Sequence, residues 1–319
     1  MSFFIQNLDN IKNKNIFISG GSGIIGKELV KKLISLGANI TVGDLKKCPA
    51  EFLKKIKYIK KDLNYLKFSE IKNFKPEIFI HLAATYERTV ESKNFFSNNF
   101  HNNIRLSNHL LSIFCKYKKI KKIIFASSYL VYSPNLYLSR KAKKPFSLNE
   151  NSEIYPRNLI AASKLYHESE LKFISNFRPD LSIICARIFR GYGLNSRDVI
   201  SRWVRDLLKK KLIKVYSVKS SFDFIFSRDS AEAIINMIKI KDRFSIINVG
   251  YGRSIKISTV LKTLNSYFKN LKKKNTSFSS QIENSLANIN ILKNKIKFKP
   301  QYSFEKSLEE IISYEKKKI

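Results

Sequence analysis

The chain has 319 residues, 44% of them hydrophobic, which is enough to bury the core of one large domain with a smaller lobe. No apolar run is long enough to span a membrane, and the first residues carry no basic leader or cleavable site, so we expect a cytoplasmic protein. Three scattered cysteines, Cys48, Cys115 and Cys185, argue against a disulfide framework or a zinc site.

The net charge of +35 at pH 7 is the strongest compositional signal. Such an excess of Lys and Arg favours nucleic acid, anionic lipid or phosphorylated substrates as partners. The lysines are dispersed, however, with only short clusters at 209–211, 272–274 and 316–318, whereas a nucleic-acid protein concentrates them on one face or tail. We therefore interpret the charge as a general enrichment in Lys, with a nucleic-acid interface as the alternative.

The first half of the chain alternates strand-like and helix-like segments. An amphipathic helix is predicted at 24–37 and a longer helix at about 92–118. Short apolar runs predict strands at 15–19, 39–44, 57–62, 77–84 and 121–128. Because strands separated by helices pair in parallel, we expect an α/β fold with a doubly wound parallel sheet of about seven strands.

The second half begins with a polar stretch, 133–158, that three prolines interrupt, so it predicts a loop. A helix at 159–176 and a strand at 181–187 continue the sheet. Further helices are predicted, with short strands between them, near 198–211, 229–239, 257–270 and 304–316. We expect residues 1–187 to form mainly the sheet domain and 188–319 mainly a small C-terminal α/β lobe, with interleaved chain segments.

A glycine-rich turn links the first strand to the first helix through Gly20, Gly23 and Gly26. Glycines there let the backbone approach a pyrophosphate, whose charge the helix N-terminus favours. Asp44 ends the second strand, where a carboxylate accepts hydrogen bonds from a ribose and repels a 2′-phosphate, so NAD is favoured over NADP. The nearby Lys46 and Lys47 weaken that preference. The alternative is a glycine turn that only packs helix against strand.

Several motifs occur in a fixed order along nearly the whole chain. They are "GGSGIIG" (20–26), "HLAA" (81–84), "FASSYLVY" (125–132), "RIFRGYG" (187–193), "FDFIFSRDSAEAI" (222–234) and "INVG" (247–250). In this order and spacing the chain resembles the extended short-chain dehydrogenases, the NAD-dependent epimerase/dehydratase family, whose members mostly modify nucleotide sugars. The resemblance implies a Rossmann-type sheet domain with a substrate-binding lobe. It also implies a homodimer built on the two long helices, 92–118 and 159–176.

The resemblance carries a set of expected roles onto this sequence. Asn103 matches the structural Asn of the family, and Ser128 and Lys164 match its catalytic Ser and Lys. The expected NAD-binding residues are Gly20, Gly23, Ile24, Ile25, Gly26, Asp44, Asp62, Leu63, Leu82, Ala83, Ala84 and Lys164.

The chain departs from the family at the catalytic Tyr, whose position holds Ile160. A positioned acid/base group contributes about 10²–10⁴ in rate, and Ile cannot replace it. Candidate substitutes lie on loops that we expect to face the cofactor: Tyr86, Glu87, Tyr129 and Tyr155, and Lys164 itself if it is desolvated. The alternative for each Tyr is a packing or surface aromatic.

Two further departures concern the substrate. The Asn of the family's RxxN turn is Arg190, and the Arg that binds the diphosphate is Phe222. We expect Arg190, together with Arg187, Arg197 or Arg202, to replace that cation, because a planar guanidinium suits a phosphate. Ser128 and Tyr129 are the expected contacts to the sugar.

Ser128 is followed by Tyr129 and Leu130. These two residues differ from the ones that the dehydratases and decarboxylases of the family have at the same positions. Oxidation, reduction or epimerisation at C4 of a nucleotide-linked or phosphorylated sugar remains, with NAD as cofactor and a rearranged acid/base. The alternative is a member without activity that binds RNA or another ligand. The retained Ser128 and Lys164 favour the enzyme. The four histidines lack metal-like spacing; we expect His81 to be structural and His101, His109 and His167 to lie on the surface or a dimer face.

Overall fold

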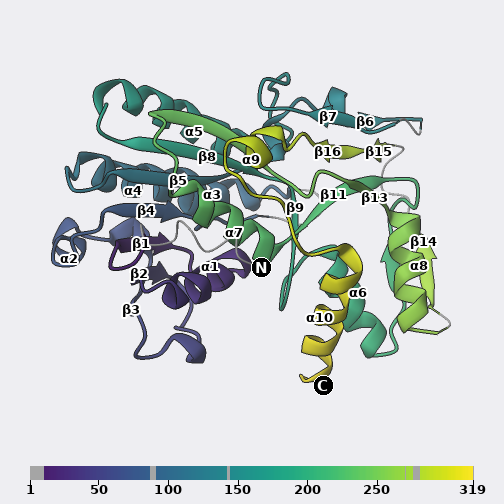
Figure 1. Cartoon of the computed structure of the whole chain (residues 1–319). Helices are drawn as coiled ribbons and strands as arrows, with labels where there is room; N and C mark the ends of the chain where they lie inside the picture. The colour runs from purple at the N-terminus through teal and green to yellow at the C-terminus, as the bar shows by residue number, and fades with distance from the viewer. Residues whose placement is uncertain (1–10, 87–90, 142–143, 270, 276–280, 319) are drawn as a thin grey trace. The chain divides into compact units, whose positions relative to one another are not determined.

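The structure is a computed structural model and describes residues 11–86, 91–141, 144–269, 271–275 and 281–318 (Figure 1). The chain divides into two compact units, each assembled from three segments. The first unit consists of Met1–Val131, Pro156–Arg187 and Ala231–Ile247. The second unit consists of Tyr132–Tyr155, Ile188–Ser230 and Asn248–Ile319.

The first unit is built on a seven-stranded sheet with the strand order β12-β8-β5-β4-β1-β2-β3. Its strands are β1 (Asn15–Ser19), β2 (Asn39–Asp44), β3 (Lys57–Lys60), β4 (Ile78–His81), β5 (Lys122–Ser128), β8 (Ser182–Ile188) and β12 (Phe244–Val249). The registered pairs β1–β2, β1–β4, β2–β3 and β4–β5 are all parallel. The predicted doubly wound parallel sheet is therefore confirmed.

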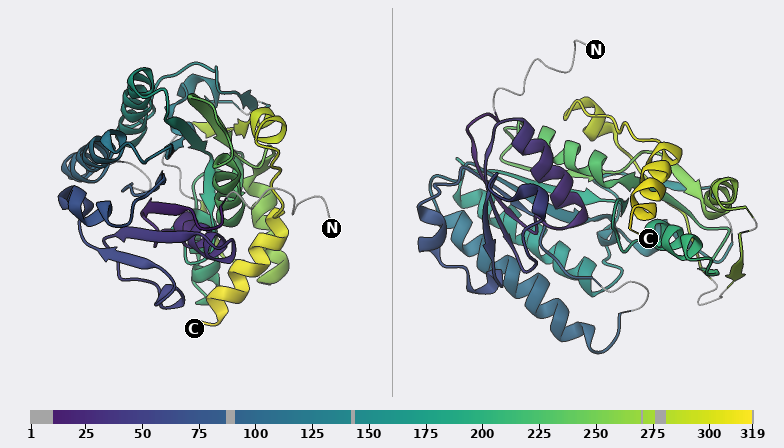
Figure 2. Two further views of the ribbon diagram at one scale, coloured as in Figure 1. Left: turned by 60° about the vertical axis from the view of Figure 1, so that its left-hand side comes forward. Right: turned by 90° about the horizontal axis from the view of Figure 1, so that it is seen from below.

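Helices cover both faces of this sheet (Figure 2). On one face lie α1 (Ile24–Ser35) and α7 (Ser227–Met237), joined by an ion pair of 3.0 Å between Lys32 and Glu232. On the other face lie the helical run that contains α4 (Leu106–Lys116) and the long helix α5 (Leu159–Phe177). Because both faces are covered, the strands are apolar along most of their length rather than alternating.

Aromatic side chains fill the space between the sheet and α4. Phe17, Phe79, Phe114 and Phe125 are all 0% exposed. The rings of Phe79 and Phe114 stack with their centroids 3.9 Å apart, and Phe17 packs against both of them. This cluster fixes α4 on β1, β4 and β5, the strands that carry most of the predicted site.

The helix predicted at 92–118 is shorter and contains a π-helical turn. It runs from α3 (Phe95–Asn99) through a π-helix (Phe100–Arg105) into α4. Asn103 lies buried in the π-helical turn, where its Oδ1 accepts from the N–H of Thr85 at 2.8 Å and its Nδ2 donates to the carbonyl of Thr85 at 3.0 Å. The π turn thus anchors the segment that leaves β4. Periodicity of 3.6 residues predicts a helix here but does not reveal the π turn.

Other predicted bounds shift by a few residues. Strand β4 ends at His81 rather than at 84, and β3 ends at Lys60 rather than at 62. The stretch predicted as a loop, 133–158, contains the short strands β6 (Leu138–Ser139) and β7 (Phe146–Leu148). The remaining short elements are the helix α2 (Phe68–Lys72) and 3₁₀ turns at Ala50–Phe52, Leu63–Tyr65, Tyr129–Val131 and Pro134–Leu136.

The second unit contains small sheets packed with helices. A three-stranded sheet has the order β13-β11-β9, and three two-stranded sheets pair β10 with β14, β15 with β6 and β16 with β7. The strands not yet given are β9 (Arg190–Tyr192), β10 (Ile213–Val215), β11 (Ser221–Phe226), β13 (Ser254–Lys256), β14 (Lys273–Asn275), β15 (Ile282–Glu283) and β16 (Ser285–Ala287). The helices are α6 (Val199–Leu208), α8 (Ile257–Tyr267), α9 (Asn290–Asn294) and α10 (Phe304–Lys316).

A buried carboxylate organises the loops of the second unit. Asp223, in β11, is 0% exposed and accepts hydrogen bonds from the backbone N–H groups of Tyr251, Gly252 and Ala287 at 2.7, 2.9 and 3.0 Å. Burial raises its pKa to about 7, although these N–H groups act in the opposite direction. Asp223 therefore serves the fold of the unit rather than a ligand.

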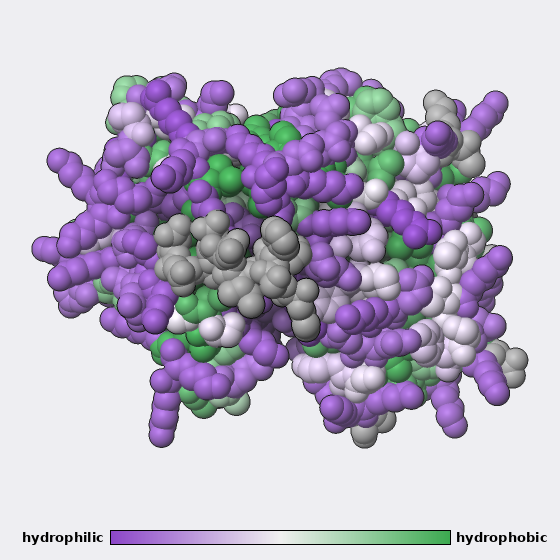
Figure 3. All heavy atoms as spheres, viewed as in Figure 1, coloured by the Kyte–Doolittle hydropathy of each residue, from purple (hydrophilic) through white to green (hydrophobic). Residues whose placement is uncertain are grey.

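Hydrophilic side chains spread over the face of the molecule that Figure 3 shows instead of gathering on one element. This distribution agrees with the dispersal of Lys along the sequence. Among the residues that the structure describes, no helix combines the length and the apolar character needed to cross a bilayer.

Candidate cofactor and catalytic site

The predicted cofactor and catalytic residues of the first unit meet at the carboxyl edge of its sheet. The glycine loop follows β1, Asp44 ends β2, Leu82 follows β4 and Ser128 ends β5. These strands are neighbours in the sheet and run in parallel, so their carboxyl ends lie at one edge. Ligands of open α/β sheets bind at this edge, beside the point where the strand order reverses.

The glycine loop is packed too tightly for larger residues. Gly20 has a φ of +78°, and a Cβ there would lie 2.7 Å from the N atom of Ala83. A Cβ on Gly26 would lie 2.4 Å from the carbonyl oxygen of Gly20. The loop thus brings the start of α1 against the segment after β4, with Leu82 and Ala83 half-buried and Ala84 exposed beside it.

The N-terminus of α1 is suited to an anion. Its N-cap is Gly23, and among the described residues no side chain caps it; its first turn, which begins with Ile24 and Ile25, contains no acidic residue. The backbone N–H groups at this end therefore keep their capacity for a ligand, and the helix dipole favours negative charge there. These features fit the pyrophosphate of a dinucleotide.

Asp44 is bonded to the glycine loop itself. Its Oδ2 accepts from the N–H and the hydroxyl of Ser22, at 2.9 and 2.6 Å, and its Oδ1 accepts from the N–H of Lys46 at 3.0 Å. A carboxylate oxygen can accept about two hydrogen bonds, so Oδ1 keeps one position for a ribose hydroxyl. The arrangement fits the predicted role of Asp44 in favouring NAD.

Asp62, the residue predicted to lie near the adenine, belongs to a polar cluster. Its Oδ1 accepts from the N–H and the side chain of Asn64, both at 2.9 Å, and its Oδ2 lies 2.9 Å from Nε2 of His101. Burial acts to raise the pKa of Asp62, but these hydrogen bonds outweigh it and lower the pKa. Leu63 is buried next to it. His101, predicted to lie on the surface or on a dimer face, is a partner of this acid.

Lys164 lies one turn inside α5 and is only 6% exposed. Its Nζ is 4.6 Å from the centroid of the Phe125 ring, and among the described residues it has no hydrogen-bond acceptor. Burial lowers its pKa to about 8, while the charge of Glu168 acts in the opposite direction. A buried ammonium group without an acceptor retains its donors for a ligand.

Ser128 is half-buried at the end of β5, where its Oγ accepts from the N–H of Leu130 at 3.2 Å. The hydroxyl proton therefore remains available for a substrate oxygen. Tyr129, the next residue, is 4% exposed, so its predicted contact with a substrate stays a prediction.

A carboxylate that the sequence did not single out contacts the backbone of Ile160, the residue that replaces the family's Tyr. Glu91 accepts from the N–H of Leu159 with Oε2, at 2.7 Å, and from the N–H of Ile160 with Oε1, at 3.1 Å. Helix α5 already has an N-cap in Asn158, whose side chain accepts from the N–H of Ala161. An acid 69 positions before Ile160 forms no local pattern with it, so only the three-dimensional structure reveals the pair.

A buried ion pair lies beyond Lys164 on α5. Glu168 accepts from Nη2 and Nε of Arg187 at 2.7 and 3.0 Å and from the hydroxyl of Ser127 at 2.5 Å. Both charged side chains are 3% exposed. The prediction that Arg187 binds a substrate phosphate is therefore wrong, because its guanidinium is buried and committed to Glu168.

Three of the histidines make contacts that support the fold of the first unit. His81 is 0% exposed and lies between the hydroxyls of Ser19 and Ser107, at 2.6 and 2.9 Å, as a structural residue should. Burial lowers its pKa well below the usual value. His167 was predicted to lie on the surface or on a dimer face, but it is 1% exposed and paired with Glu170, so that prediction is wrong. His109 contacts the carbonyl of Leu66 at 2.8 Å.

The loop candidates for a substitute acid/base differ in exposure. Tyr86 is 44% exposed and follows Thr85, the residue anchored by Asn103, whereas Tyr155, which belongs to the second unit, is 66% exposed. Glu87 lies outside the described residues. The catalytic role of Tyr86 stays a prediction.

In the second unit, Arg190 lies against the residue that replaces the family's Arg. Its Cζ is 4.2 Å from the centroid of the Phe222 ring, and its Nη2 is 3.2 Å from both carboxylate oxygens of Glu283. Arg202, on α6, is half-buried, and its side chain has no partner among the described residues. Arg197 is exposed.

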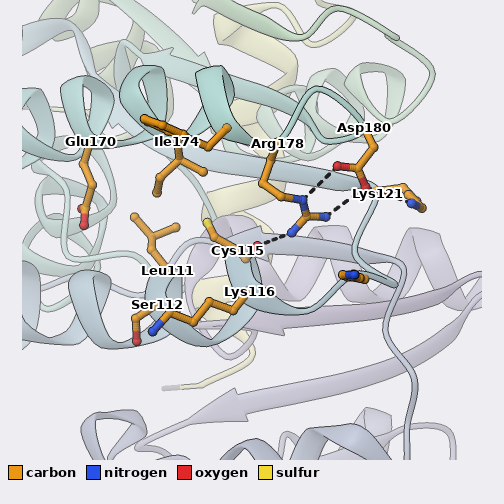
Figure 4. Close-up of a pocket in the computed structure, with 11 residues that line it drawn as sticks. Leu111, Ser112, Cys115, Lys116, Lys121, Glu170, Ile174, Arg178 and Asp180 are labelled. Atoms are coloured by element: carbon orange, nitrogen blue, oxygen red, sulfur yellow. Dashed lines mark hydrogen bonds and ion pairs between the residues drawn. The ribbon is translucent and has the colours of Figure 1, made fainter.

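A pocket of about 660 Å³ lies between α4 and α5 of the first unit (Figure 4). Leu111, Ser112 and Cys115 line it from α4, and Glu170 and Ile174 line it from α5. Its lining includes none of the residues predicted to hold cofactor or substrate. This pocket is therefore not the candidate active site.

Comparison with known proteins agrees with this arrangement. The sequence model of the NAD dependent epimerase/dehydratase family matches residues 16–250. The chain is 26% identical to the dTDP-4-dehydro-6-deoxyglucose reductase of Escherichia coli, over 81% of this chain and 82% of that protein. It is 27% identical to the ADP-L-glycero-D-manno-heptose-6-epimerase of Brachyspira hyodysenteriae, over 80% and 81%.

Solved structures show the same fold. The UDP-N-acetylglucosamine 4-epimerase from Methanobrevibacter ruminantium M1, in complex with UDP-N-acetylmuramic acid, superposes with a TM-score of 0.82 at 27% identity, covering 97% of this chain and 100% of that one. The UDP-glucuronic acid 4-epimerase from Bacillus cereus, in complex with UDP-glucuronic acid and NAD, gives a TM-score of 0.83 at 21% identity, with 95% and 99% covered. The glycine loop and the parallel sheet agree with the match of the family model to residues 16–250. The chain therefore belongs to the NAD dependent epimerase/dehydratase family, and its cofactor is NAD.

Proposed function

We propose that the chain is an enzyme that uses NAD to oxidise, reduce or epimerise C4 of a nucleotide-linked or phosphorylated sugar, with a rearranged acid/base group. The observation that carries this proposal is the buried Lys164 ammonium, which lacks an acceptor among the described residues. A desolvated cation without a hydrogen-bond acceptor destabilises the fold, so its retention favours a functional role. The relatives named above are enzymes of nucleotide sugars, so the RNA-binding alternative is not favoured.

The proposed NAD site uses residues of the first unit. The N-terminus of α1, from Gly23 to Gly26, would bind the pyrophosphate, Asp44 the adenosine ribose and Asp62 the adenine. Lys164 would donate to the hydroxyls of the nicotinamide ribose, a charge-assisted hydrogen bond. When bound, NAD would accept a hydride, which is a proton with two electrons, from a sugar carbon and could return it.

The proposed substrate contacts are Ser128, Tyr129, Arg190 and Arg202. Ser128 would donate its hydroxyl proton to the reacting sugar oxygen. Arg190, stacked on Phe222, would supply the phosphate-binding cation in place of the missing Arg, with Glu283 fixing its orientation. The sequence-based predictions for the two lobes, NAD in 1–187 and substrate in 188–319, remain part of this proposal.

We also infer a homodimer through α4 and α5, with the cytoplasm as the expected location. Phe173 and Phe177 on α5 are 63% and 69% exposed, and Phe96 on α3 is 64% exposed. Large exposed aromatics on neighbouring helices are typical of an interface. A monomer in scattering at micromolar concentration would contradict the dimer.

The test combines NAD binding with turnover. Purified chain is titrated with NAD and NADP by fluorescence, and both NADH absorbance and the configuration of the product sugar are then followed with UDP-, dTDP- and ADP-linked sugars. We expect NAD to bind more tightly than NADP, and Asp44→Ala to reduce the difference between the two dissociation constants. We also expect at least one sugar to transfer a hydride to bound NAD or to accept one from NADH.

Two results would contradict the proposed function. If NAD binds but no sugar in the panel is oxidised, reduced or epimerised, the chain is not an active member of the family. Tight RNA binding that persists at physiological salt would instead support the alternative.

A further inference from the structure

The segment that leaves β4 is fixed at both ends in the first unit. At its start, the side chain of Asn103 holds both the N–H and the carbonyl of Thr85. At its end, the carboxylate of Glu91 holds the N–H groups of Leu159 and Ile160. The structure therefore delivers one acid, from a distant part of the sequence, to the start of the helix that carries Lys164.

Glu91 is more than a helix cap. The Asn158 side chain already accepts from the N–H of Ala161, so α5 has an N-cap of its own. Among the residues that the structure describes, each oxygen of Glu91 accepts a single N–H, which leaves each of them one further position for a proton or a hydroxyl. The side chain is half-buried, so a proton that it accepts is partly shielded from bulk water.

Glu91 contacts the backbone of Ile160, the residue that stands where the family has its acid/base. In the family that the chain resembles, the Tyr at position 160 supplies this group, four residues before the Lys. Four helical residues rise about 6 Å, so the carboxylate at the N–H of Ile160 lies about one turn from the backbone of Lys164. Glu is an ordinary general base, and a carboxylate held by N–H donors is fixed in position.

We propose that Glu91 is the proton acceptor of this active site, in place of the Tyr that Ile160 does not supply. This inference rests on the proposed function. During oxidation the sugar O–H bond breaks, its proton bonds to a free position of the Glu91 carboxylate, and the electron pair left on oxygen forms the carbonyl bond. The hydrogen and electron pair of the C–H bond pass to NAD, the oxidant, and reduction reverses these steps.

The test uses Glu91→Gln, which keeps an oxygen for one of the two N–H groups but cannot accept a proton. We expect turnover to fall at least about 100-fold, with the NAD dissociation constant and the unfolding temperature nearly unchanged. The rise of the rate with pH on the acid side should disappear as well. Adding Ile160→Tyr in this background should restore turnover at least about tenfold, because Tyr supplies the family's own group.

The matched control is Glu77→Gln. Glu77 also accepts a backbone N–H, from Asn15 at 3.2 Å, but it precedes β4, at the opposite edge of the sheet. We expect this variant to keep wild-type turnover. A readout independent of turnover is the carboxyl carbon resonance of Glu91, assigned by its absence in Glu91→Gln. It should move when NAD is added to the wild type, whereas that of Glu77 should not.

The outcomes separate the inference from the function on which it rests. If the wild type turns over and Glu91→Gln keeps its rate and its acid-side pH dependence, the inference is wrong and the function stands. An unmoved Glu91 resonance on saturation with NAD also overturns it. A wild type that binds NAD but converts no sugar overturns both.

Discussion

The start of β5 and the start of α5 each contain a buried lysine, and the two differ in what surrounds the ammonium group. Burial lowers the pKa of both Lys122 and Lys164 to about 8. Lys122 donates to the hydroxyl of Ser182 at 3.0 Å and to the carbonyls of Met237 and Ile240. Lys164 has no hydrogen-bond acceptor among the described residues; its Nζ lies over the ring of Phe125, and the charge of Glu168 acts on it from a distance.

This difference distinguishes a structural cation from a functional one. The carbonyls that receive Lys122 lie at and after the end of α7, where they also accept from the N–H of Ile240 and the hydroxyl of Ser182. Lys122 therefore completes the fold by itself. Lys164 bears a similar burial penalty without acceptors of its own, so its partner must come from a ligand. Burial and a lowered pKa alone would not separate the two residues.

The largest expected effect comes from Lys164→Met. Turnover should fall at least about 100-fold and NAD affinity about tenfold, because a charge-assisted hydrogen bond to the cofactor is lost. The unfolding temperature should stay the same or rise, because Met removes a buried charge without leaving a carbonyl unpaired. Kinetics, fluorescence titration and thermal unfolding measure the three quantities. A large loss of stability would show that Lys164 is structural after all.

Lys122→Met should produce the opposite pattern. The free energy of unfolding should fall by about 2 kcal/mol, because buried carbonyl and hydroxyl groups lose a charged hydrogen-bond donor. Turnover of the folded enzyme should remain within about twofold, since Lys122 lies at the edge of the sheet opposite to Ser128. Urea unfolding and kinetics on the same preparation test this pair of expectations. Equal losses of stability in Lys122→Met and Lys164→Met would remove the distinction.

A smaller effect should appear in the pH dependence of stability. Both lysines have a folded-state pKa of about 8, below the unfolded value of about 10.4, so the unfolded chain binds more protons between these values. Their contribution therefore makes the free energy of unfolding rise as pH increases from about 8 to 10. Lys164→Met should reduce that slope by up to about 1.4 kcal/mol per pH unit. An unchanged slope would mean that Lys164 is protonated throughout this range.

Much of the fold follows from local sequence. Strands β1 and β2 have the predicted bounds, 15–19 and 39–44, and α10 has the predicted bounds 304–316. Each is a compact apolar or amphipathic run with clear ends, so neighbouring residues determine it. The helix predicted at 92–118 contains a π turn that was not predicted, and in this turn Asn103 contacts Thr85, a residue outside the helix.

The candidate site was predictable only where a motif is continuous in sequence. The glycine loop, Ser128 and Lys164 could be named because each belongs to a short pattern. Glu91 and the Glu168–Arg187 pair could not, because the partners are far apart in sequence and their charge types occur throughout this chain. Arg187 and His167 were misassigned for the same reason, since burial depends on packing between elements.

The order of the strands also affects how the protein is made. Strand β8 ends at Ile188, but its sheet neighbour β12 begins only at Phe244. At about 5–20 residues per second, a ribosome needs roughly 3–11 s to synthesise the chain between them. During that interval β8 is an open, strongly apolar edge, the kind of surface that pairs with other nascent chains. Chaperone protection during translation should therefore matter most for this stretch, between the emergence of β8 and that of β12.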